Sequence, residues 1–427
     1  MTTACTIGVD VGTSGCRAVA ITASGESIAE AMVPLQAPVR LPDGGVEQDP
    51  ELWWQGLLAV LRRIGKALDG RAVKTLCLDG TSATLLLCEP DGAPLGPALM
   101  YNDCRAREQA ARIAAVAPDD SPARGASSSL AKLLFLRDRY QPRQPVLALN
   151  QADWLCGRLL GEQGASDWNN GLKLGFDPAL EAWPDWLDRL ALAPIGLPRC
   201  HRPGAVLGTL AESVCAQIGW MPGVRVSAGT TDSTAAVLAT GAASVGDAVT
   251  SLGSTLVLKI VSDRPVSSPE YGVYSHRIGR LWLVGGASNT GGAVLRQYFD
   301  DARIQALSAG IDPSVPSGLD YYPLPGPGER FPRNDPTLQP RLSPRPTDDR
   351  RFLHGLLEGI ARIEAAGYKR LAALDAPSPR RVLTIGGGAG NPIWTAMRQR
   401  LLGRPVVPAR HQQAAYGAAL LARGHDL

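Results

Sequence analysis

The first stretch with the composition of a reactive site reads TIGVDVGTSGCRAVAI. It places one acid, Asp10, just before a turn that contains Gly12, Thr13 and Ser14. The backbone N–H groups and the two hydroxyls of such a turn can face an anion without obstruction by Cβ atoms, which makes the turn a candidate phosphate cradle. Asp10 would repel a bare phosphate, so its presence indicates a divalent cation between the carboxylate and the phosphate oxygens. The alternative is an ordinary hairpin with favourable turn residues.

A second acid, Asp232, follows a β-rich run in VRVSAGTTDSTAAVLATG and precedes an alanine-rich segment. An ionised carboxylate there can accept the proton of a substrate hydroxyl that attacks a γ-phosphorus, as aspartates do in other phosphoryl transfers. The alternative is a helix cap, in which the carboxylate accepts hydrogen bonds from the first N–H groups of a helix. The sequence places Asp232 near the N-terminus of that helix.

Two glycine turns in the second half of the chain have the composition of ligand-binding loops. SLGSTL repeats the phosphate cradle without an acid, and TIGGGAGNPIW carries three glycines ahead of a helix that Asn and Pro can start. Close approach of the backbone to a flat or anionic ligand is the functional interpretation, although the spacing is not the GxGxxG dinucleotide fingerprint. An ordinary hairpin and a tight strand-to-helix turn are the alternatives. The candidate residues are Gly253, Ser254, Thr255, Gly387, Gly388 and Asn391.

Two further strand ends offer groups that suit a polyhydroxylated substrate. In CLDGTSATLL, Thr81 and Ser82 follow Gly80 and can hydrogen-bond sugar hydroxyls, and MYNDCRA adds Asn102. Lys132, in SSSLAKLLFL, is interpreted as a solvated helix lysine, with a reach toward the substrate as the alternative.

The two halves of the chain show a similar order of short apolar runs, which predicts an internal duplication. Each half opens on a hairpin with a Gly-Ser/Thr turn, continues into a third strand and later supplies another apolar strand that runs into glycine. A chance similarity between two hairpins is the alternative. The expected strand regions are 6–11, 16–21, 27–35, 74–82, 248–260, 280–286 and 381–391.

Helices are expected between these strands. The segment 49–68 has Asp49 as N-cap and Pro50 at the first helical position, and its two tryptophans are expected in the core. A second helix is expected at 352–374 from its apolar spacing. The small-residue stretch ATGAASVGDA suits a domain boundary, and the eight prolines from 323 to 346 predict an irregular surface loop.

Composition narrows the class of protein. The 427 residues, 45% of them hydrophobic and 19% charged, fit two soluble globular domains. The net charge of +3 comes from scattered Lys and Arg, which argues against a nucleic-acid partner. The eight cysteines form no CxxC and several lie in apolar runs, as reduced core residues do. With no signal peptide and no run long enough for a bilayer, a cytoplasmic protein without a membrane partner is expected.

Seven motifs in a fixed order resemble the FGGY carbohydrate kinases, of the actin-like, ribonuclease-H-like superfamily. They are DVGTSGCR, EQDPELWW, YNDCRA, AKLLFLRD, GTTDSTAA, SLGST and GGGAGN. The resemblance implies an α/β fold of two actin-like domains with ATP and sugar in an interdomain cleft. It assigns 1–241 to a sugar-binding domain with the catalytic base, and 242–427 to a nucleotide-binding domain whose last helix packs back on the first.

The resemblance also implies roles for single residues. Asp10 corresponds to the magnesium-associated acid, and Asp232 to the catalytic base, which also lies near the metal. Thr13 and Ser14, in the turn that begins at Gly12, correspond to groups near the transferred phosphate. The other implied sites are sugar contacts at Asp10, Gly80, Thr81, Ser82, Asn102 and Asp232, a second phosphate turn at Gly253, Ser254 and Thr255, and an adenosine-side loop at Gly387, Gly388 and Asn391.

Two departures from the family pattern concern the sugar. Xylulokinases of the family usually have Met-His-Gly where this chain has Gly80, Thr81 and Ser82, and Asn where it has Ser233. DGTS with GTTDS is similar to a short subgroup of D-ribulose or xylulokinase-like kinases. The resemblance thus favours phosphorylation of D-ribulose to D-ribulose 5-phosphate by direct in-line transfer, in a monomer or homodimer. The alternatives are a xylulokinase, or an actin-like ATPase that phosphorylates no sugar.

Overall fold

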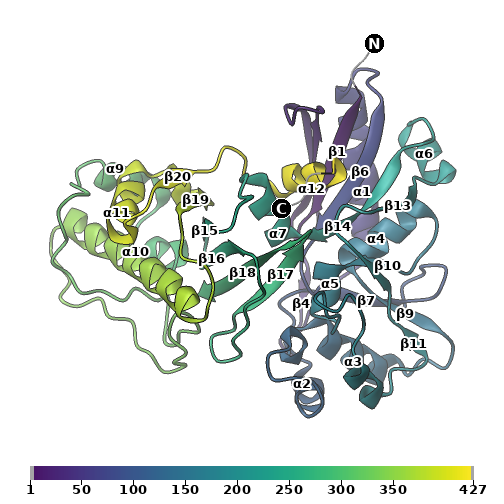
Figure 1. Ribbon diagram of the computed structural model, residues 1–427, viewed down its shortest axis with the longest axis horizontal. Coiled ribbons are helices and arrows are strands. Elements are labelled where there is room, and N and C mark those ends of the chain that lie inside the picture. Colours follow the sequence, from purple (N-terminus) through teal and green to yellow (C-terminus); the bar gives the residue numbers. More distant parts are fainter. Residues whose placement is uncertain (1–3, 425–427) are drawn as a thin grey trace. The chain divides into compact units, whose positions relative to one another are not determined.

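The computed structural model describes residues 4–424, which divide into two compact units (Figure 1). The first unit contains the described chain up to Ala239, the segment His276–Gly279 and the chain from Gln413 onward. The second contains Thr240–Ser275 and Arg280–Gln412. No helix within residues 4–424 is both long and apolar enough to cross a membrane.

The main sheet of the first unit combines an antiparallel meander with parallel strands. β1, β2 and β3 run antiparallel in chain order, while β6 lies parallel to β1 and β14 parallel to β6. The carboxyl ends of β1, β6 and β14 therefore meet at one edge of the sheet. In spatial order the strands are β13 (Val206–Thr209), β14 (Arg225–Thr231), β6 (Val73–Gly80), β1 (Cys5–Val11), β2 (Gly15–Ile21) and β3 (Ser27–Pro34).

Helices cover both faces of this sheet because alternate side chains of β1 point to opposite faces. Ile7 and Val9 pack against the tryptophans of α1 (Pro50–Ala67), which are buried in the core as predicted. On the other face α12 (Ala414–Ala422) approaches so closely that a Cβ on Gly8 would lie 2.0 Å from the Ala415 carbonyl oxygen. Figure 1 shows α12, from the end of the chain, beside β1, from its beginning.

The first unit contains a second sheet, and α2 and α3 pack against it through a separate apolar core. Its spatial order is β11 (Ile195–Gly196), β9 (Val146–Asn150), β7 (Leu85–Cys88), β8 (Ala98–Leu99), β5 (Val46–Gln48) and β4 (Val39–Arg40). A two-stranded sheet joins β10 (Ala165–Asp167) to β12 (Arg199–His201). The other helices of this unit are α2 (Arg107–Ala114), α3 (Ser129–Tyr140), α4 (Gln151–Leu160), α5 (Trp168–Leu172), α6 (Glu212–Ile218) and α7 (Asp232–Ala239).

The position of Lys132 in α3 corrects a prediction. The sequence suggested a solvated helix lysine, whereas the side chain has no exposed surface. Its Nζ donates hydrogen bonds to the carbonyl oxygens of Ala83 and Ser127, which replace the water that a surface lysine would bind.

The sheet of the second unit repeats the strand pattern of the first. β15, β16 and β18 form an antiparallel series, and β19 and β20 continue the sheet in parallel with β15. This repetition is what the predicted duplication requires. In spatial order the strands are β17 (Tyr274–Ile278), β18 (Leu281–Ser288), β16 (Leu256–Ser262), β15 (Asp247–Leu252), β19 (Arg381–Ile385) and β20 (Val406–Pro408).

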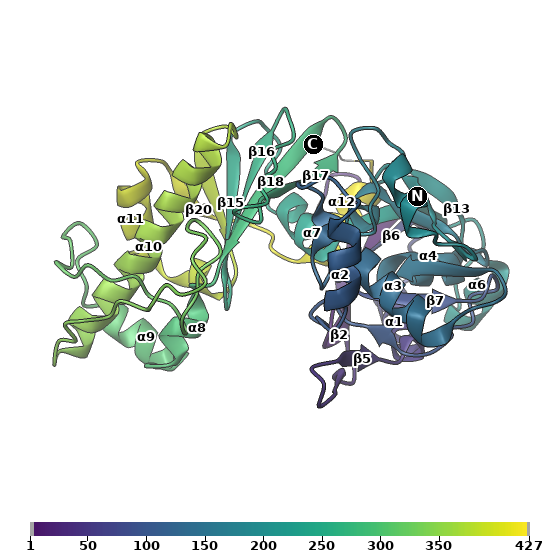
Figure 2. The ribbon, with the colours of Figure 1, turned by 90° about the horizontal axis from the view of Figure 1, so that it is seen from below.

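The helices of the second unit confirm two sequence expectations. α10 (Asp349–Ala373) starts three residues before the predicted 352 because Asp348 caps it. α11 (Pro392–Leu402) starts at Pro392 with Asn391 as its cap, as predicted. Figure 2 shows α10 and α11 together beside β20. The remaining helices are α8 (Gly292–Arg296) and α9 (Asp301–Ser308).

The proline-rich segment 323–346 has no helix and no regular strand, as predicted, but it does not lie wholly on the surface. Phe331 is 1% exposed because its ring packs where Gly286 and Gly367 leave room. The prediction of a surface loop is therefore wrong for this residue.

Candidate active site

The carboxyl edge of the first-unit sheet brings together acids that are far apart in the sequence. Asp10 lies near the end of β1 and is directly opposite Asp79 on β6. Asp79 in turn lies opposite Thr230 on β14, two residues before Asp232. The parallel register therefore gathers Asp10, Asp79 and Asp232, and the electrostatic influence of both other acids on Asp79 reflects this proximity.

Asp79 is the most deeply buried of the three acids. It has no exposed surface, and no N–H or hydroxyl donor within the described residues reaches either carboxylate oxygen. The carboxyl groups of Asp79 and Asp10 lie on neighbouring strands in direct register, and the repulsion between two ionised carboxylates there favours a proton on one of them. Burial, followed by the negative charges of Asp10 and Asp232, raises the pKa of Asp79 well above its usual range.

Asp10 is less isolated than Asp79. Burial raises its pKa, while the neighbouring Asp79 carboxyl group and the charge of Arg17 oppose that rise. The Arg17 guanidinium lies 3.5 Å from the carboxylate on the neighbouring strand β2. Asp10 is therefore the better stabilised anion of the pair.

Asp232 is the first residue of α7 and is partly exposed, which distinguishes it from Asp79. Its Oδ1 accepts a hydrogen bond of 2.6 Å from the backbone N–H of Ser233. Asp232 therefore lies at the start of a helix, as the sequence predicted, and close to the strand ends. Its partial exposure also gives a substrate access to the carboxylate.

The turn after β1 is closed by one backbone hydrogen bond and leaves two hydroxyls without partners among the described residues. The N–H of Gly12 donates to the Gly15 carbonyl oxygen at 3.0 Å and closes the turn. Thr13 is partly exposed and Ser14 exposed, and neither hydroxyl has a hydrogen-bond partner within residues 4–424. Two hydroxyl donors are thus available beside Asp10.

The turn after β6 separates the two residues that the sequence treated alike. The Thr81 hydroxyl lies 2.9 Å from Oε1 of Gln151 and 2.6 Å from the Thr84 hydroxyl, so it is used inside the protein. Ser82 is partly exposed, and in the described chain its hydroxyl has no partner. Ser82 is therefore the hydroxyl that this turn can offer to a ligand, and Thr81 shapes the turn.

Asn102 and Asp103 of the YND motif also differ in their surroundings. The carboxylate of Asp103 accepts from the Val46 N–H and from Arg105, which makes it a structural group. Asn102 is partly exposed, whereas its Oδ1 atom is buried and has no partner among the residues described. The sugar contact expected of Asn102 therefore stays a prediction.

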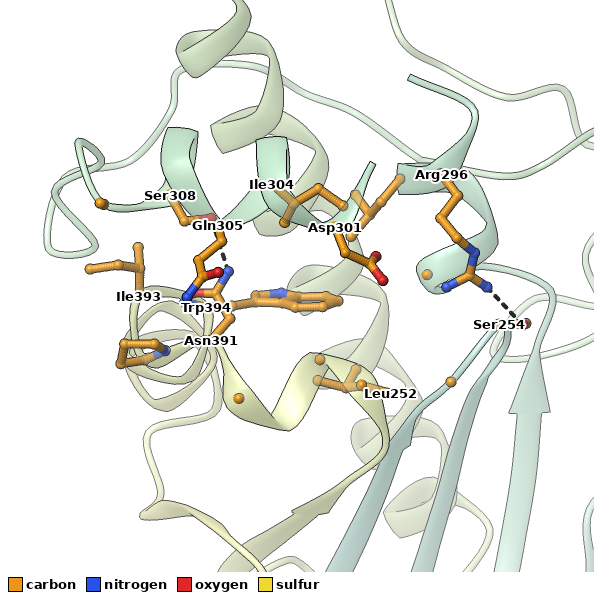
Figure 3. A pocket seen from close by; sticks show the side chains of 18 residues that line it. Leu252, Ser254, Arg296, Asp301, Ile304, Gln305, Ser308, Asn391, Ile393 and Trp394 are labelled. Atoms are coloured by element: carbon orange, nitrogen blue, oxygen red, sulfur yellow. Dashed lines mark hydrogen bonds between the residues drawn. The ribbon is translucent and has the colours of Figure 1, made fainter. Parts of the chain in front are cut away.

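The second unit contains a cavity of about 540 Å³ beside its two glycine turns (Figure 3). Leu252, Ile304, Ile393 and Trp394 supply apolar walls. Five glycines line the cavity as well, and a Cβ on Gly387 would meet no atom within 4 Å, so the backbone leaves open space there. Of the six candidates in this half, Gly253, Ser254, Gly387, Gly388 and Asn391 line the cavity and Thr255 does not.

Figure 3 shows the polar groups of this cavity. A guanidinium N–H of Arg296 on α8 donates to the Ser254 hydroxyl at 2.8 Å. Asp301 and Gln305 project from α9. Asn391 accepts from the Trp394 N–H and donates to the Ser308 hydroxyl, so its side chain holds the start of α11.

Three residues that sequence reasoning missed belong to these sites: Asp79, Gln151 and Arg296. An acid directly before Gly80, at the end of an apolar strand, was a readable signal for Asp79. Gln151 and Arg296 gave no such signal, because only the packing of α4 and α8 brings them to the turns.

A metal site is not defined by the side chains alone. The described part of the chain contains no group of three or more His, Cys, Asp or Glu residues arranged to hold a metal ion. The magnesium roles of Asp10 and Asp232 therefore stay predictions.

Comparison with known proteins identifies relatives along almost the whole chain. The FGGY family of carbohydrate kinases matches with its N-terminal domain at residues 5–239 and its C-terminal domain at 248–423. The xylulose kinase of Streptomyces coelicolor is 30% identical over 457 residues, with 98% of this chain and 87% of the relative covered. That of Escherichia coli is 27% identical over 422 residues, with 94% and 85% covered.

A solved structure shows the same fold. The ligand-bound xylulose kinase of Lactobacillus acidophilus has a TM-score of 0.86 at 17% identity, with 98% of this chain and 89% of that chain covered. The predicted α/β fold of two actin-like domains is thereby confirmed. With both family domains matched over most of its length, the chain belongs to the FGGY family of carbohydrate kinases and is a phosphotransferase.

Proposed function

We propose that this kinase transfers the γ-phosphate of ATP to the terminal hydroxyl of a ketopentose. The observation that carries the proposal is the gathering of Asp10, Asp79 and Asp232 with free hydroxyls at one sheet edge. The second unit, on the same strand framework, offers an apolar cavity with a glycine turn at its margin. One site has the groups for proton transfer, and the other has the shape for a nucleotide.

On the acceptor side, Asp232 acts as the general base. Its carboxylate accepts the proton of the attacking hydroxyl, and its exposure allows that hydroxyl to approach. Ser82 and Asn102 hydrogen-bond other hydroxyls of the sugar, and Gly80 and Thr81 shape the turn that carries Ser82. The transfer is direct and in line, without a covalent intermediate on the enzyme.

Asp10 with its surroundings fits a magnesium ion. The two carboxylate oxygens of Asp79 lack donors and lie next to Asp10, and buried acceptor oxygens without donors suit a cation or its water ligands. Bound Mg²⁺ would neutralise charge on the transferred phosphoryl group. Asp10, with Asp232 nearby, would hold the ion, while the hydroxyls of Thr13 and Ser14, in the turn that begins at Gly12, would donate to phosphate oxygens.

On the nucleotide side, the apolar walls of the cavity accept the base and the glycine turns approach the phosphates. Gly253, Ser254 and Thr255 form the second phosphate turn, and Gly387 and Gly388, with Asn391 at the helix start, form the adenosine-side loop. Arg296 is bonded to Ser254, and we assign its positive charge to the phosphate tail of ATP.

The acceptor sugar is proposed in order of support. The names of the relatives favour D-xylulose, which replaces D-ribulose as the first candidate. D-ribulose is the second candidate because this turn differs from that of the usual xylulokinases. It offers the sugar the hydroxyl of Ser82, where those kinases have the imidazole of Met-His-Gly nearby. The 241/242 domain boundary, the cleft between the domains, the cytoplasmic location and the choice between monomer and homodimer stay predictions.

The test is ADP release by the purified chain with magnesium and ATP, against D-xylulose, D-ribulose, L-ribulose, glycerol and no sugar. We expect one ketopentose to stimulate release strongly and to yield a sugar phosphate in equal amount. Stimulation by glycerol alone, or slow release that no sugar changes, would contradict the proposal. The second of these results would favour an actin-like ATPase.

A further inference from the structure

Lys132 is a fully buried lysine whose hydrogen bonds go to backbone carbonyls. Its Nζ lies 2.6 Å from the Ala83 oxygen and 2.9 Å from the Ser127 oxygen. In the described part of the chain it forms no ion pair with a carboxylate. Burying an amine without a counter-ion costs free energy, and an apolar side chain of similar volume would pack there more cheaply. The two contacts therefore need an explanation beyond packing.

The first contact holds a strained residue. Ala83 has a φ of +64°, in the left-handed region, which a residue with a Cβ adopts only at a cost in free energy. It lies in the turn that the Thr84 N–H closes onto the Thr81 carbonyl oxygen at 3.3 Å. The hydrogen bond from Lys132 Nζ to the Ala83 carbonyl oxygen favours the peptide orientation that this turn requires.

The rest of the turn is held by Gln151. Its Oε1 accepts from both the N–H and the hydroxyl of Thr81, and its N–H donates to the Thr84 carbonyl oxygen. Gln151 and Lys132 thus hold the turn through different atoms. Between their contacts stands Ser82, partly exposed and with its hydroxyl unused by the described chain.

We propose that Lys132 is a positioning residue, which fixes the turn 81–84 so that the Ser82 hydroxyl faces the sugar. The sugar as ligand rests on the proposed function, whereas the conformation of the turn does not. Lys132 acts on the acceptor through Ser82 and makes no contribution to nucleotide binding. A purely structural role in anchoring α3 would instead impair both substrates together.

The kinetic test compares Lys132→Met with Lys74→Met. Lys74 is an exposed lysine on β6, the strand that leads into the turn. We expect Lys132→Met to raise the KM for the ketopentose about tenfold, with the ATP KM unchanged, and Lys74→Met to change neither. In a Ser82→Ala background the effect of Lys132→Met should shrink to about twofold, because both changes remove the same contact. Equal effects in the two backgrounds, or parallel loss of both substrates, would overturn the proposal.

Hydrogen exchange of the turn gives a readout that does not depend on activity. Lys132→Met should speed exchange of the Thr84 amide while amides in β1 keep their protection. Unchanged exchange at Thr84 would refute positioning. If the wild-type chain phosphorylates no ketopentose, the proposed function fails while this measurement still decides the role of Lys132.

A rescue covers the case in which Lys132→Met does not fold. Glycine adopts a φ of +64° without strain, so adding Ala83→Gly should restore folding and most of the protection at Thr84. If Ala83→Gly restores neither, Lys132 serves packing alone and the proposal is wrong.

Discussion

The sheet edge of the first unit and the cavity of the second are built on the same order of strands but differ in charge and burial. The first gathers three acids, of which Asp79 has no exposed surface. The second has only two charged residues among those that line it, Arg296 and Asp301, within mostly apolar and glycine walls. The difference teaches that the strand framework fixes where a site forms, while the residues after each strand fix its chemistry.

The largest expected effect tests the chemical side of this comparison. Asp232→Asn keeps the size of the side chain but removes the base, so we expect kcat to fall by roughly 10³-fold. ATP affinity, measured by calorimetry without sugar, should not change. Asp188→Asn is the matched control and should retain kcat within about threefold, because Asp188 is exposed and belongs to neither candidate site. A kcat near wild type in Asp232→Asn would remove this residue as the base.

Asp79→Asn tests the cost of burying charge in the first site. Because the pKa of Asp79 is raised in the folded state, the folded protein binds more protons than the unfolded protein above pH 3.8. The stability of the wild-type protein therefore falls as the pH rises. We expect the substitution to raise the free energy of unfolding by roughly 1–3 kcal/mol at pH 7. The gain should vanish near pH 4, as followed by urea titration. A variant that is less stable at pH 7 would contradict the inference that Asp79 is destabilised by its buried, donor-free position.

Arg296→Gln tests the second site, where we expect binding and not chemistry to change. Loss of the guanidinium should weaken ATP binding about tenfold and leave adenosine binding unchanged, by calorimetry with both ligands. Arg303→Gln is the control, because Arg303 is exposed on the neighbouring helix α9 and is not among the residues that line the cavity. An equal loss for adenosine would assign Arg296 to the shape of the cavity instead of the phosphates.

The smallest effect concerns the pH dependence that Lys132 adds to the first unit. Burial lowers its pKa to about 7 from 10.5, with Asp103, Cys104 and Lys173 as the charged or titratable neighbours. Between these values the unfolded state binds more protons, so wild-type stability rises with pH and the Lys132→Met variant lacks that rise. The stability of the wild type relative to the variant should rise by about 1 kcal/mol from pH 7.5 to 8.5. Parallel stability curves would show that the amine titrates normally.

Much of the site could be read from the sequence because its residues follow strands that local patterning specifies. Asp10 and its turn, Asp232 at a helix start, and the cap at Asn391 all lie where short motifs placed them. Such features depend on a few neighbouring residues, so their signals are local. The family resemblance then gave them an order along the chain.

The sequence by itself determined the strand ends, the helix caps and the family, since each rests on residue type and spacing. Tertiary structure alone decided that Asp79 joins the acids, because that depends on the register of β6 against β1 and β14. It also decided that Thr81 turns inward while Ser82 stays free, and that Lys132 is buried. These outcomes depend on contacts between segments that are far apart in the chain, such as β6 with β14, about 150 residues away. No local pattern encodes which partner a side chain meets.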